Sequence, residues 1–526
     1  MEFKLLVFIS VAYLWCFIGT NCDKPCIPMP VHNRSVVCVC NTTYCDTVTR
    51  ISPTSDTFIT YTSSENGLRF KMTKHEFNTN TGSADKDSAT GSCSNTLLLH
   101  PDVMYQAIRG FGGAVTDSAG LNWKSLPESL QKDLIDSYFS EKGLQYNMIR
   151  VPIGGTDFST HGYAFNERPE NDPQLSNFTL AYEDYEYKLP MIKAAVEASS
   201  TEIFVLGTTW SPPLWMKKHR HYTGFNTLKH EYSATYALYH LRFIEEYEKN
   251  GIKIWGITLT NEPINGIIGI PFVPCLGWTA DTLAPWVIDH LGPAIRNSKY
   301  KDTLLLAGDD QRITIPYWIN YMIGKHPKIV DYVDAIAVHY YTDNISPPDL
   351  LTEIGILYPD KFIIATEACT GSGWLDKDHV DLGSWQRAKI YAKDIIQDLN
   401  HGVAGWIDWN MCLNEVGGPT WTGNRVDSPI IVFSNNNTFV KQPMFYVMGH
   451  FSKFIPRDSR RIKTTSSDCW PDSISHVAFI TPGNTIVMVI YNDGDSEKTV
   501  NIKIKEKLAV VATSPHSITT IELPMS

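Results

Sequence analysis

Eight short apolar segments alternate with longer amphipathic segments along the chain, and this alternation restricts the fold more than any other feature. Helical patterns lie between most of them, for example in Tyr232–Asn250 and Gly383–Leu399. The apolar segments are Ala107–Gly112, Asn147–Pro152, Ile203–Thr208, Ile254–Leu259, Leu304–Gly308, Ala335–His339, Phe362–Thr366 and Gly405–Asp408. Strands that alternate with helices form parallel sheets, and eight such units over roughly 340 residues predict an α/β fold, a (β/α)₈ TIM barrel with insertions.

The two ends of the chain show a different pattern. Thr57–Thr81 and Val477–Thr520 alternate polar and apolar residues and have a β-rich composition, which is typical of antiparallel strands with one face on a core. We expect both ends to belong to one β-sandwich. The chain of 526 residues would start in that smaller domain, build the barrel and return.

Residues 1–22 have the pattern of a secretory signal peptide. Lys4 precedes a mostly apolar run, Leu5–Ile18, and small and polar residues follow it. The run is too short to span a membrane comfortably, although a membrane anchor is the alternative. Because no later stretch approaches about 18 unbroken apolar residues, we expect the rest of the chain to be soluble.

Four cysteines crowd into the segment after this leader, at Cys26, Cys38, Cys40 and Cys45. In an oxidising compartment they predict two small disulfide loops. A zinc site is the alternative, but secretion and the uneven spacing argue against it. If the two cysteines of residues 1–22 leave with the signal, an odd number remains of the 11, so at least one thiol is free.

Composition and short motifs limit the functional classes. The net charge of −11 and the absence of basic stripes exclude a nucleic-acid partner, and an acidic surface suits an acidic compartment. No metal or nucleotide motif occurs, so we expect no metal and no cofactor. Five sequons predict glycosylation in a secretory protein, at Asn33, Asn41, Asn177, Asn344 and Asn436.

Two glutamates stand where predicted barrel strands end. Glu262 follows the fourth strand in the motif Asn261-Glu262-Pro263, and Glu367 follows the seventh. Active sites of TIM barrels lie at this rim, and glycoside hydrolysis requires two carboxylates. Either glutamate alone could be an ordinary solvated loop residue, but the pair predicts a glycosidase site.

Polar and aromatic residues follow most of the other strands. A sugar pocket needs this mixture of rings and hydrogen-bonding groups. Singly, each residue has a structural alternative: an ion pair for Arg150, a buried histidine for His339, a packing role for Trp409. The residues concerned are Asp117, Arg150, Asp157, Trp210, His339, Tyr341, Asp408 and Trp409.

Long motifs resemble the lysosomal acid β-glucosidases (glucosylceramidases) of glycoside hydrolase family 30. The resemblance covers nearly all of the chain after the leader. Its motifs are residues 35–41 (SVVCVCN), 110–114 (GFGGA), 137–143 (SYFSEKG), 382–385 (LGSW), 427–432 (DSPIIV) and 449–456 (GHFSKFIP).

The resemblance implies a role for each matching residue. Glu262 would be the general acid/base, Glu367 the nucleophile, and Arg150 the residue that orients the nucleophile. The cysteines would pair as Cys26–Cys38 and Cys40–Cys45. Substrate-binding positions would be Asp157, Trp210, Asn261, His339, Tyr341, Trp409 and Asn424. Two positions depart from the family pattern: Ile270 stands where a tyrosine is expected, and Thr156 where a cysteine is usual.

The resemblance also implies a domain plan, a substrate and a location. The fold would be the barrel, an immunoglobulin-like sandwich and a small disulfide-bearing antiparallel sheet. The divisions would be a leader (1–22), the disulfide-bearing segment (23–50), sandwich strands (51–105 and 457–526) and the barrel (106–456), with an excursion at 411–441 that packs on the small sheet.

The implied reaction is retaining hydrolysis of glucosylceramide in the lysosome lumen at a membrane surface, with secretion as another destination. A saposin-type activator and a lysosomal sorting receptor are the expected partners. The apolar residues near the site, which could meet the bilayer or the activator, are Ile267, Ile268, Ile270, Phe272 and Trp374. Two alternatives stay open: a retaining glycosidase of the same fold with another β-glycoside, or a non-catalytic carbohydrate-binding protein.

Overall fold

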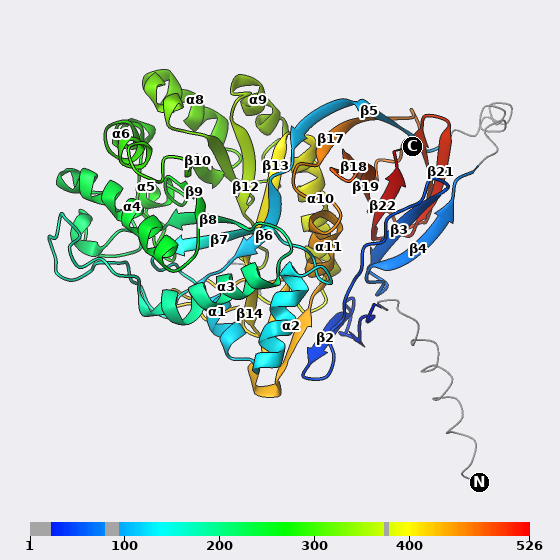
Figure 1. Cartoon of the computed structure of the whole chain (residues 1–526), viewed down its shortest axis with the longest axis horizontal. Helices are drawn as coiled ribbons and strands as arrows, with labels where there is room; N and C mark the ends of the chain where they lie inside the picture. The colour runs from blue at the N-terminus through cyan, green and yellow to red at the C-terminus, as the bar shows by residue number, and fades with distance from the viewer. Residues whose placement is uncertain (1–22, 79–93, 373–377, 526) are drawn as a thin grey trace, which may run out of the picture.

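The computed structural model describes residues 23–78, 94–372 and 378–525. In this part the chain forms a closed barrel, a nine-stranded sheet that makes the β-sandwich, and a five-stranded sheet (Figure 1). The barrel and the sandwich lie side by side in Figure 1, and the smaller sheet lies below them. The predicted signal peptide and Trp374 lie outside the described residues.

Eight barrel strands are present as predicted, although the first begins at Gly110 and not at Ala107. Each pairs with its neighbours in parallel, and the last strand pairs with the first to close the barrel. The strands are β6 (Gly110–Ala114), β7 (Met148–Ile153), β8 (Phe204–Thr209), β9 (Ile254–Thr258), β10 (Leu304–Gln311), β11 (Ala335–His339), β12 (Phe362–Glu367) and β13 (Val403–Asn410).

Alternate side chains of these strands face two cores. On β12, Ile364 lies in the barrel interior with residues such as Leu206 and Leu306. Its neighbours Ile363 and Ala365 belong to the larger core that includes residues of the surrounding helices. Burial on both sides explains why the strands appear in the sequence as continuous apolar runs.

Helices of varied length surround the barrel (Figure 1). The longer ones present an apolar stripe to the strands; on α10 the buried positions include Ala388, Tyr391, Ala392 and Ile395, at helical spacing. The helices are α1 (Asp117–Lys124), α2 (Glu128–Phe139), α3 (Leu189–Ala198), α4 (Ser233–Lys249), α5 (Asn265–Ile268), α6 (Ala280–Trp286), α7 (Gly292–Arg296), α8 (Ile315–Lys325), α9 (Asp349–Leu357), α10 (Trp385–Asn400) and α11 (Pro443–Ser452).

The two ends of the chain pair in the nine-stranded sheet, as their common pattern predicts. β3 from the start of the chain lies antiparallel to β22 from its end. The order is β21-β20-β5-β17-β18-β19-β22-β3-β4. The strands are β3 (Thr57–Ser64), β4 (Lys71–Glu76), β5 (Thr96–Ala107), β17 (Arg460–Ser466), β18 (Ile474–Ile480), β19 (Thr485–Asn492), β20 (Lys498–Ile504), β21 (Lys507–Thr513) and β22 (Ser517–Pro524).

The five-stranded sheet joins the start of the chain to the excursion after β13. Its order is β1-β2-β16-β15-β14, and the strands are β1 (Pro28–Met29), β2 (Val37–Asn41), β14 (Cys412–Asn414), β15 (Ile430–Phe433) and β16 (Thr438–Lys441). The sheet is mixed rather than wholly antiparallel, because β14 and β15 run in parallel. A long crossover between these two strands allows that direction.

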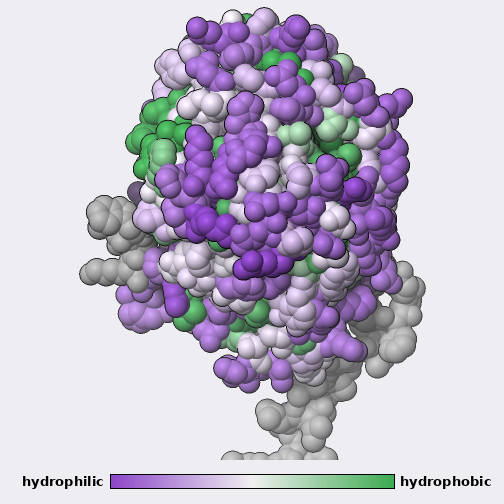
Figure 2. Space-filling view, turned by 90° about the vertical axis from the view of Figure 1, so that its left-hand side faces the viewer, coloured by the Kyte–Doolittle hydropathy of each residue, from purple (hydrophilic) through white to green (hydrophobic). Residues whose placement is uncertain are grey.

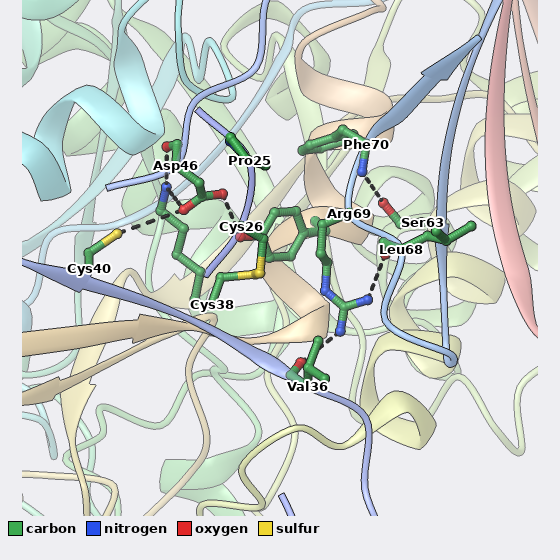
Figure 3. The surroundings of a disulfide bond; sticks show 12 residues. Pro25, Cys26, Val36, Cys38, Cys40, Asp46, Ser63, Leu68, Arg69 and Phe70 are labelled. Atoms are coloured by element: carbon green, nitrogen blue, oxygen red, sulfur yellow. Dashed lines mark hydrogen bonds and ion pairs between the residues drawn. A yellow bond between two sulfur atoms is a disulfide. The ribbon is translucent and has the colours of Figure 1, made fainter. Parts of the chain in front are cut away.

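Both disulfides of the small sheet form as the resemblance implies, Cys26–Cys38 and Cys40–Cys45. Figure 3 shows Arg69 beside the first of them. Its guanidinium donates to the carbonyl oxygens of Val36 and Leu68, each at 2.7 Å, and so ties the small sheet to the sandwich.

Three further cysteines, all buried, are free thiols: Cys275, Cys369 and Cys412. Of the five sequon asparagines, Asn41 is half-buried and the other four are exposed. Among the described residues, no helix has the length and apolar character needed to cross a membrane.

Candidate active site

The two glutamates singled out in the sequence lie close together at the carboxyl end of the barrel. Glu367 is the last residue of β12, and Glu262 follows β9. One carboxylate oxygen of each, together with a ring nitrogen of His339, lies within 4.8 Å of the others. Both glutamates are buried. Carboxylates cost free energy in such a place unless donors surround them.

Glu367 accepts hydrogen bonds at both oxygens. Arg150, on β7, contacts Oε2, and the hydroxyl of Tyr341 donates to Oε1 at 2.6 Å. The same guanidinium donates to Oδ1 of Asn261 at 2.8 Å. A buried cation and a hydroxyl donor both favour the ionised form of a carboxylate.

Glu262 is surrounded by a different set of donors. The amide of Gln311 donates to Oε1 at 2.8 Å, Nδ1 of His339 lies 2.9 Å from the same oxygen, and Asn265 contacts Oε2. The backbone of Glu262 has a φ of +39°. A non-glycine residue in this region is strained, and such strain clusters at functional sites.

Asp309, which the sequence reading did not single out, connects the two glutamate environments. Its carboxylate accepts from Arg150 at 2.9 Å and lies 3.1 Å from Nε2 of His339. Hydroxyls of Thr258 and Thr366 also donate to it, at 2.8 and 2.7 Å. Asp309 directly follows a predicted strand, so the criterion that selected Glu262 would have found it.

This network fixes the charge of its members. Burial alone would raise the pKa of Asp309, but Arg150 and His339 hold it well below the usual range. Burial alone would lower the pKa of His339, but the carboxylates of Glu367 and Asp309 outweigh it and raise the pKa to about 10. His339 is therefore an imidazolium whose two N–H groups point to Asp309 and Glu262.

A cavity of about 240 Å³ opens beside the glutamates. Such a volume is below the range of about 300–1,000 Å³ typical of drug-sized ligands and suits a single sugar ring. The predicted residues that line it are Asp157, Trp210, Asn261, Glu262, Tyr341, Glu367, Trp409 and Asn424. Arg150 and His339 do not line it; they contact the glutamates from behind the wall.

Polar and aromatic residues both form this wall. Asn424 donates to Oδ2 of Asp157 at 2.7 Å. Burial raises the pKa of Asp157 to about 7, and the negative charges of Glu367 and Glu262 act in the same direction. The rings of Trp210 and Trp409 stack with their centroids 5.1 Å apart.

Two residues at strand ends do not reach the cavity. Asp117 accepts hydrogen bonds from Ser159 and Tyr163, and Asp408 accepts one from Tyr391. Asp117 therefore joins α1 to the segment after β7, and Asp408 joins β13 to α10.

The two departures from the family pattern both lie close to the site. Ile270 lines the cavity mouth together with Phe272. Thr156 accepts a hydrogen bond at its hydroxyl from the backbone of Phe158, and so shapes the turn that presents Asp157.

Three groups in the described residues have the spacing of metal ligands, but each is otherwise engaged. Cys40 and Cys45 form a disulfide. In the group of Glu262, His339 and Glu367, both histidine nitrogens face carboxylates. The third group, three aspartates, surrounds the guanidinium of Arg312.

A closed parallel barrel with two adjacent glutamates after its fourth and seventh strands, beside a sugar-sized cavity, defines a glycoside hydrolase. The comparisons agree. The chain belongs to glycosyl hydrolase family 30: the TIM-barrel domain of this family matches residues 108–455, and its β-sandwich domain matches residues 458–521.

Relatives with known names cover most of the chain. It is 39% identical over 502 residues to the lysosomal acid glucosylceramidase of Mus musculus, and the match covers 94% of each chain. It is 26% identical to the endo-1,6-β-D-glucanase BGN16.3 of Trichoderma harzianum, over 80% of this chain and 84% of the other. The crystal structure of SrfJ from Salmonella typhimurium shares the fold, with a TM-score of 0.80 at 22% identity, over 89% of this chain and 100% of that one.

Proposed function

We propose that this chain is a retaining β-glucosidase that hydrolyses glucosylceramide to glucose and ceramide. The distance between the two glutamates is the observation that supports the retaining mechanism. Retaining glycosidases hold their carboxyl groups about 5–5.5 Å apart, and inverting enzymes about 6.5–9.5 Å apart to admit a water. One oxygen of Glu262 and one of Glu367 lie within 4.8 Å of each other, which supports the retaining arrangement. The lysosomal glucosylceramidase relative supports the substrate.

In the first step a carboxylate oxygen of Glu367 attacks the anomeric carbon. The bond from that carbon to the ceramide oxygen breaks, and Glu262 gives its proton to the departing oxygen. Arg150 and the Tyr341 hydroxyl hold the carboxylate of Glu367 in place. The product of this step is ceramide and a glucosyl ester on Glu367.

In the second step Glu262 acts as a base. It takes a proton from a water whose oxygen attacks the anomeric carbon from the side that ceramide left. The ester bond breaks, and Glu367 returns as a carboxylate. Two inversions at the same carbon leave the glucose with its original β configuration.

The remaining cavity residues bind and orient the sugar. Asp157, Asn261 and Asn424 offer hydrogen-bonding groups to its hydroxyls, and Trp210 and Trp409 offer ring faces to its C–H groups. His339 touches Glu262 rather than the cavity. Its role is to position the acid/base, not to contact the sugar.

The apolar rim of the cavity suits a lipid substrate. Phe272, which lines the cavity, is 48% exposed, and Ile268, the last residue of α5 just before it, is 64% exposed. Figure 2 shows that hydrophobic residues gather in patches on the face that carries α4–α6. Exposed apolar residues beside a site are typical of surfaces that meet a membrane or a partner protein. A saposin-type activator would contact the same rim.

The cellular location follows from the same relative. A lysosomal glucosylceramidase that matches 94% of the chain supports a lysosomal location. Delivery would then start from the secretory pathway and use a lysosomal sorting receptor, with secretion as the other destination. Peripheral association with the lumenal membrane surface would bring the enzyme to its lipid.

The decisive experiment is hydrolysis of fluorescent glucosylceramide at mildly acidic pH by wild type and by Glu367→Gln. Turnover by wild type alone supports the substrate and the nucleophile. Hydrolysis of only an aryl β-glucoside, or of only another sugar in a panel of nitrophenyl glycosides, would show that glucosylceramide is not the substrate. Azide rescue of Glu262→Ala and Glu367→Ala, read as the configuration of the glycosyl azide, assigns the two roles: β for the acid/base variant and α for the nucleophile variant.

A further inference from the structure

A second buried charged cluster lies behind the active site. Its centre is the guanidinium of Arg312, which is fully buried. Three aspartates contact it: Asp343, in the segment after β11, and Asp394 and Asp398, one turn apart on α10. One oxygen of each aspartate lies within 4.8 Å of the others. These four residues are called the Arg312 cluster below.

The three carboxylates share one nitrogen of Arg312, while its Nε donor has no hydrogen-bond partner in the described part of the chain. All three contact the same nitrogen, Nη2, which carries two N–H bonds. Nη1 is directed elsewhere, to the carbonyl oxygen of Ser346 at 3.4 Å and Oε1 of Gln397 at 3.1 Å. With all carboxyls ionised the cluster would hold three negative charges against one positive charge.

The neighbouring titratable groups come from several elements. Lys393 on α10 pairs with Asp493 at 2.5 Å, and His401, directly after α10, faces Asp349 at 3.9 Å. His476 on β18 contacts Thr464. Tyr340, on the Asp343 segment, has its pKa raised by burial and by Asp394. None of these described groups adds a cation to the cluster; on β13, Trp406 donates a neutral hydrogen bond to Asp394 at 3.0 Å.

Protons are therefore the counter-charges that the cluster needs. Burial raises the pKa of all three carboxyls, and the negative charge of Asp394 raises those of Asp343 and Asp398 further. A cavity of about 1,030 Å³ between the barrel and the sandwich is lined by Asp343 and Asp394. Water in this cavity gives the carboxyls a route for proton exchange.

The cluster is connected to both catalytic glutamates through adjacent residues. Asp343 lies two residues after Tyr341, whose hydroxyl donates to Glu367 at 2.6 Å. Arg312 directly follows Gln311, whose amide donates to Glu262 at 2.8 Å. A movement of the Asp343 segment would change the distance between Tyr341 and the nucleophile.

We propose that the Arg312 cluster is a proton-loaded positioning element. With protons on two of its three carboxyls it is neutral and holds Tyr341 and Gln311 against the glutamates. When those protons leave at higher pH, repulsion pushes the Asp343 segment away and catalysis falls. The part of the proposal that concerns catalysis rests on the proposed function; the part that concerns proton-dependent stability does not.

The direction of the stability effect follows from linkage. A carboxyl with a raised pKa binds its proton more tightly in the folded than in the unfolded state, where the pKa is about 3.9. Stability is therefore greatest below that value and falls as the pH rises toward the folded-state pKa. The cluster favours the folded enzyme in an acidic compartment and weakens it near neutral pH.

The test compares Asp398→Asn with Asp349→Asn. The first variant keeps the side-chain shape and an acceptor for Arg312 but removes one ionisable group from the cluster. The second removes an aspartate whose side chain is 88% exposed on the neighbouring α9. Thermal unfolding and kcat/KM on an aryl β-glucoside are measured from pH 4.5 to 8.

Between pH 5 and 7 the melting temperature of Asp398→Asn should fall less than that of wild type. The melting temperature of Asp349→Asn should fall as much as that of wild type. The ratio of kcat/KM at pH 7 to that at pH 5 should rise by about three- to tenfold in Asp398→Asn, since a shift of one pKa unit is tenfold in equilibrium. The change should lie in kcat, because no cluster member contacts the sugar.

The proposal would be overturned if Asp398→Asn changed the melting temperature by the same amount at every pH. It would also be overturned if the pH dependence of Asp398→Asn equalled that of Asp349→Asn. If Asp398→Asn does not fold, Asp394→Asn takes its place. Infrared spectra supply a second measure: a weaker protonated-carboxyl band at pH 6 in Asp398→Asn than in wild type supports the proposal, and equal bands in the two proteins refute it. Thermal unfolding needs no substrate. It therefore still tests the proton-dependent stability of the Arg312 cluster if the enzyme turns over no glycoside.

Discussion

Asp309 and Arg150 form an ion pair, 2.9 Å long, in which neither side chain is exposed to solvent. The same carboxylate faces the imidazolium of His339 at 3.1 Å. One anion therefore balances two cations, and each cation contacts a different glutamate of the proposed catalytic pair. Asp309 touches no part of the sugar cavity, yet the orientation of both glutamates depends on it.

Replacement of Asp309 with asparagine should reduce both stability and activity. Asparagine keeps the shape but leaves Arg150 and His339 with less negative charge around them. Removal of one partner from a buried pair costs about 3–5 kcal/mol. Urea unfolding measures the stability loss, and kcat/KM on an aryl β-glucoside should fall by more than tenfold. The control is Asp360→Asn, whose side chain is 69% exposed; an equal loss in both variants would contradict the role of Asp309.

Tyr341→Phe should lower kcat and leave KM nearly unchanged. The variant loses the 2.6 Å hydrogen bond to Oε1 of Glu367, and a hydrogen bond to a charged group contributes about 1.5–3 kcal/mol. We therefore expect kcat to fall by roughly 10- to 100-fold. Steady-state kinetics measures this, with Tyr340→Phe as the matched control on the adjacent residue. A similar fall in the control would show that the loss comes from packing.

His339 should stabilise the fold over a defined pH range. Its folded-state pKa is raised to about 10, above the unfolded value of about 6.5. The stabilisation is complete below about pH 6.5 and is lost as the pH rises toward 10, at up to about 1.4 kcal/mol per pH unit. His339→Gln should lack this slope in urea unfolding at pH 6, 7.5 and 9. Exposed His32→Gln should keep it, and a slope common to both variants would rule out His339 as its source.

Most of the fold could be predicted because each barrel strand is buried on both faces and therefore appears as an apolar run. The first strand was misplaced: the predicted Ala107–Gly112 spans the end of β5, at Ala107, and the start of β6, at Gly110. Two strands separated by only two residues cannot be divided by apolar periodicity. The parallel pair β14 and β15 was also missed, because strand direction depends on a crossover that carries no periodic signal.

The cavity-lining residues could be selected because strand ends meet at one rim. The residues behind that rim could not. Asp394 and Asp398 are four apart on an amphipathic helix, where acidic residues usually belong to a solvated face. Their burial depends on Arg312, which comes from a segment more than 80 residues earlier. Contacts of this kind are set by the tertiary fold and leave no local pattern.

The apolar rim should matter for lipid substrates alone. Ile268→Ser and Phe272→Ser combined remove apolar surface from the segment after Glu262 without a change in either glutamate. Full burial of one such side chain contributes about 1.5–3 kcal/mol, so turnover of glucosylceramide in vesicles should fall by at least tenfold. Hydrolysis of a soluble aryl β-glucoside should change less than twofold. The matched control, Ile356→Ser, is 73% exposed but lies on α9, outside the segment after Glu262. If the double variant loses both activities equally, the rim shapes the sugar site; if it loses neither, this segment does not meet the lipid.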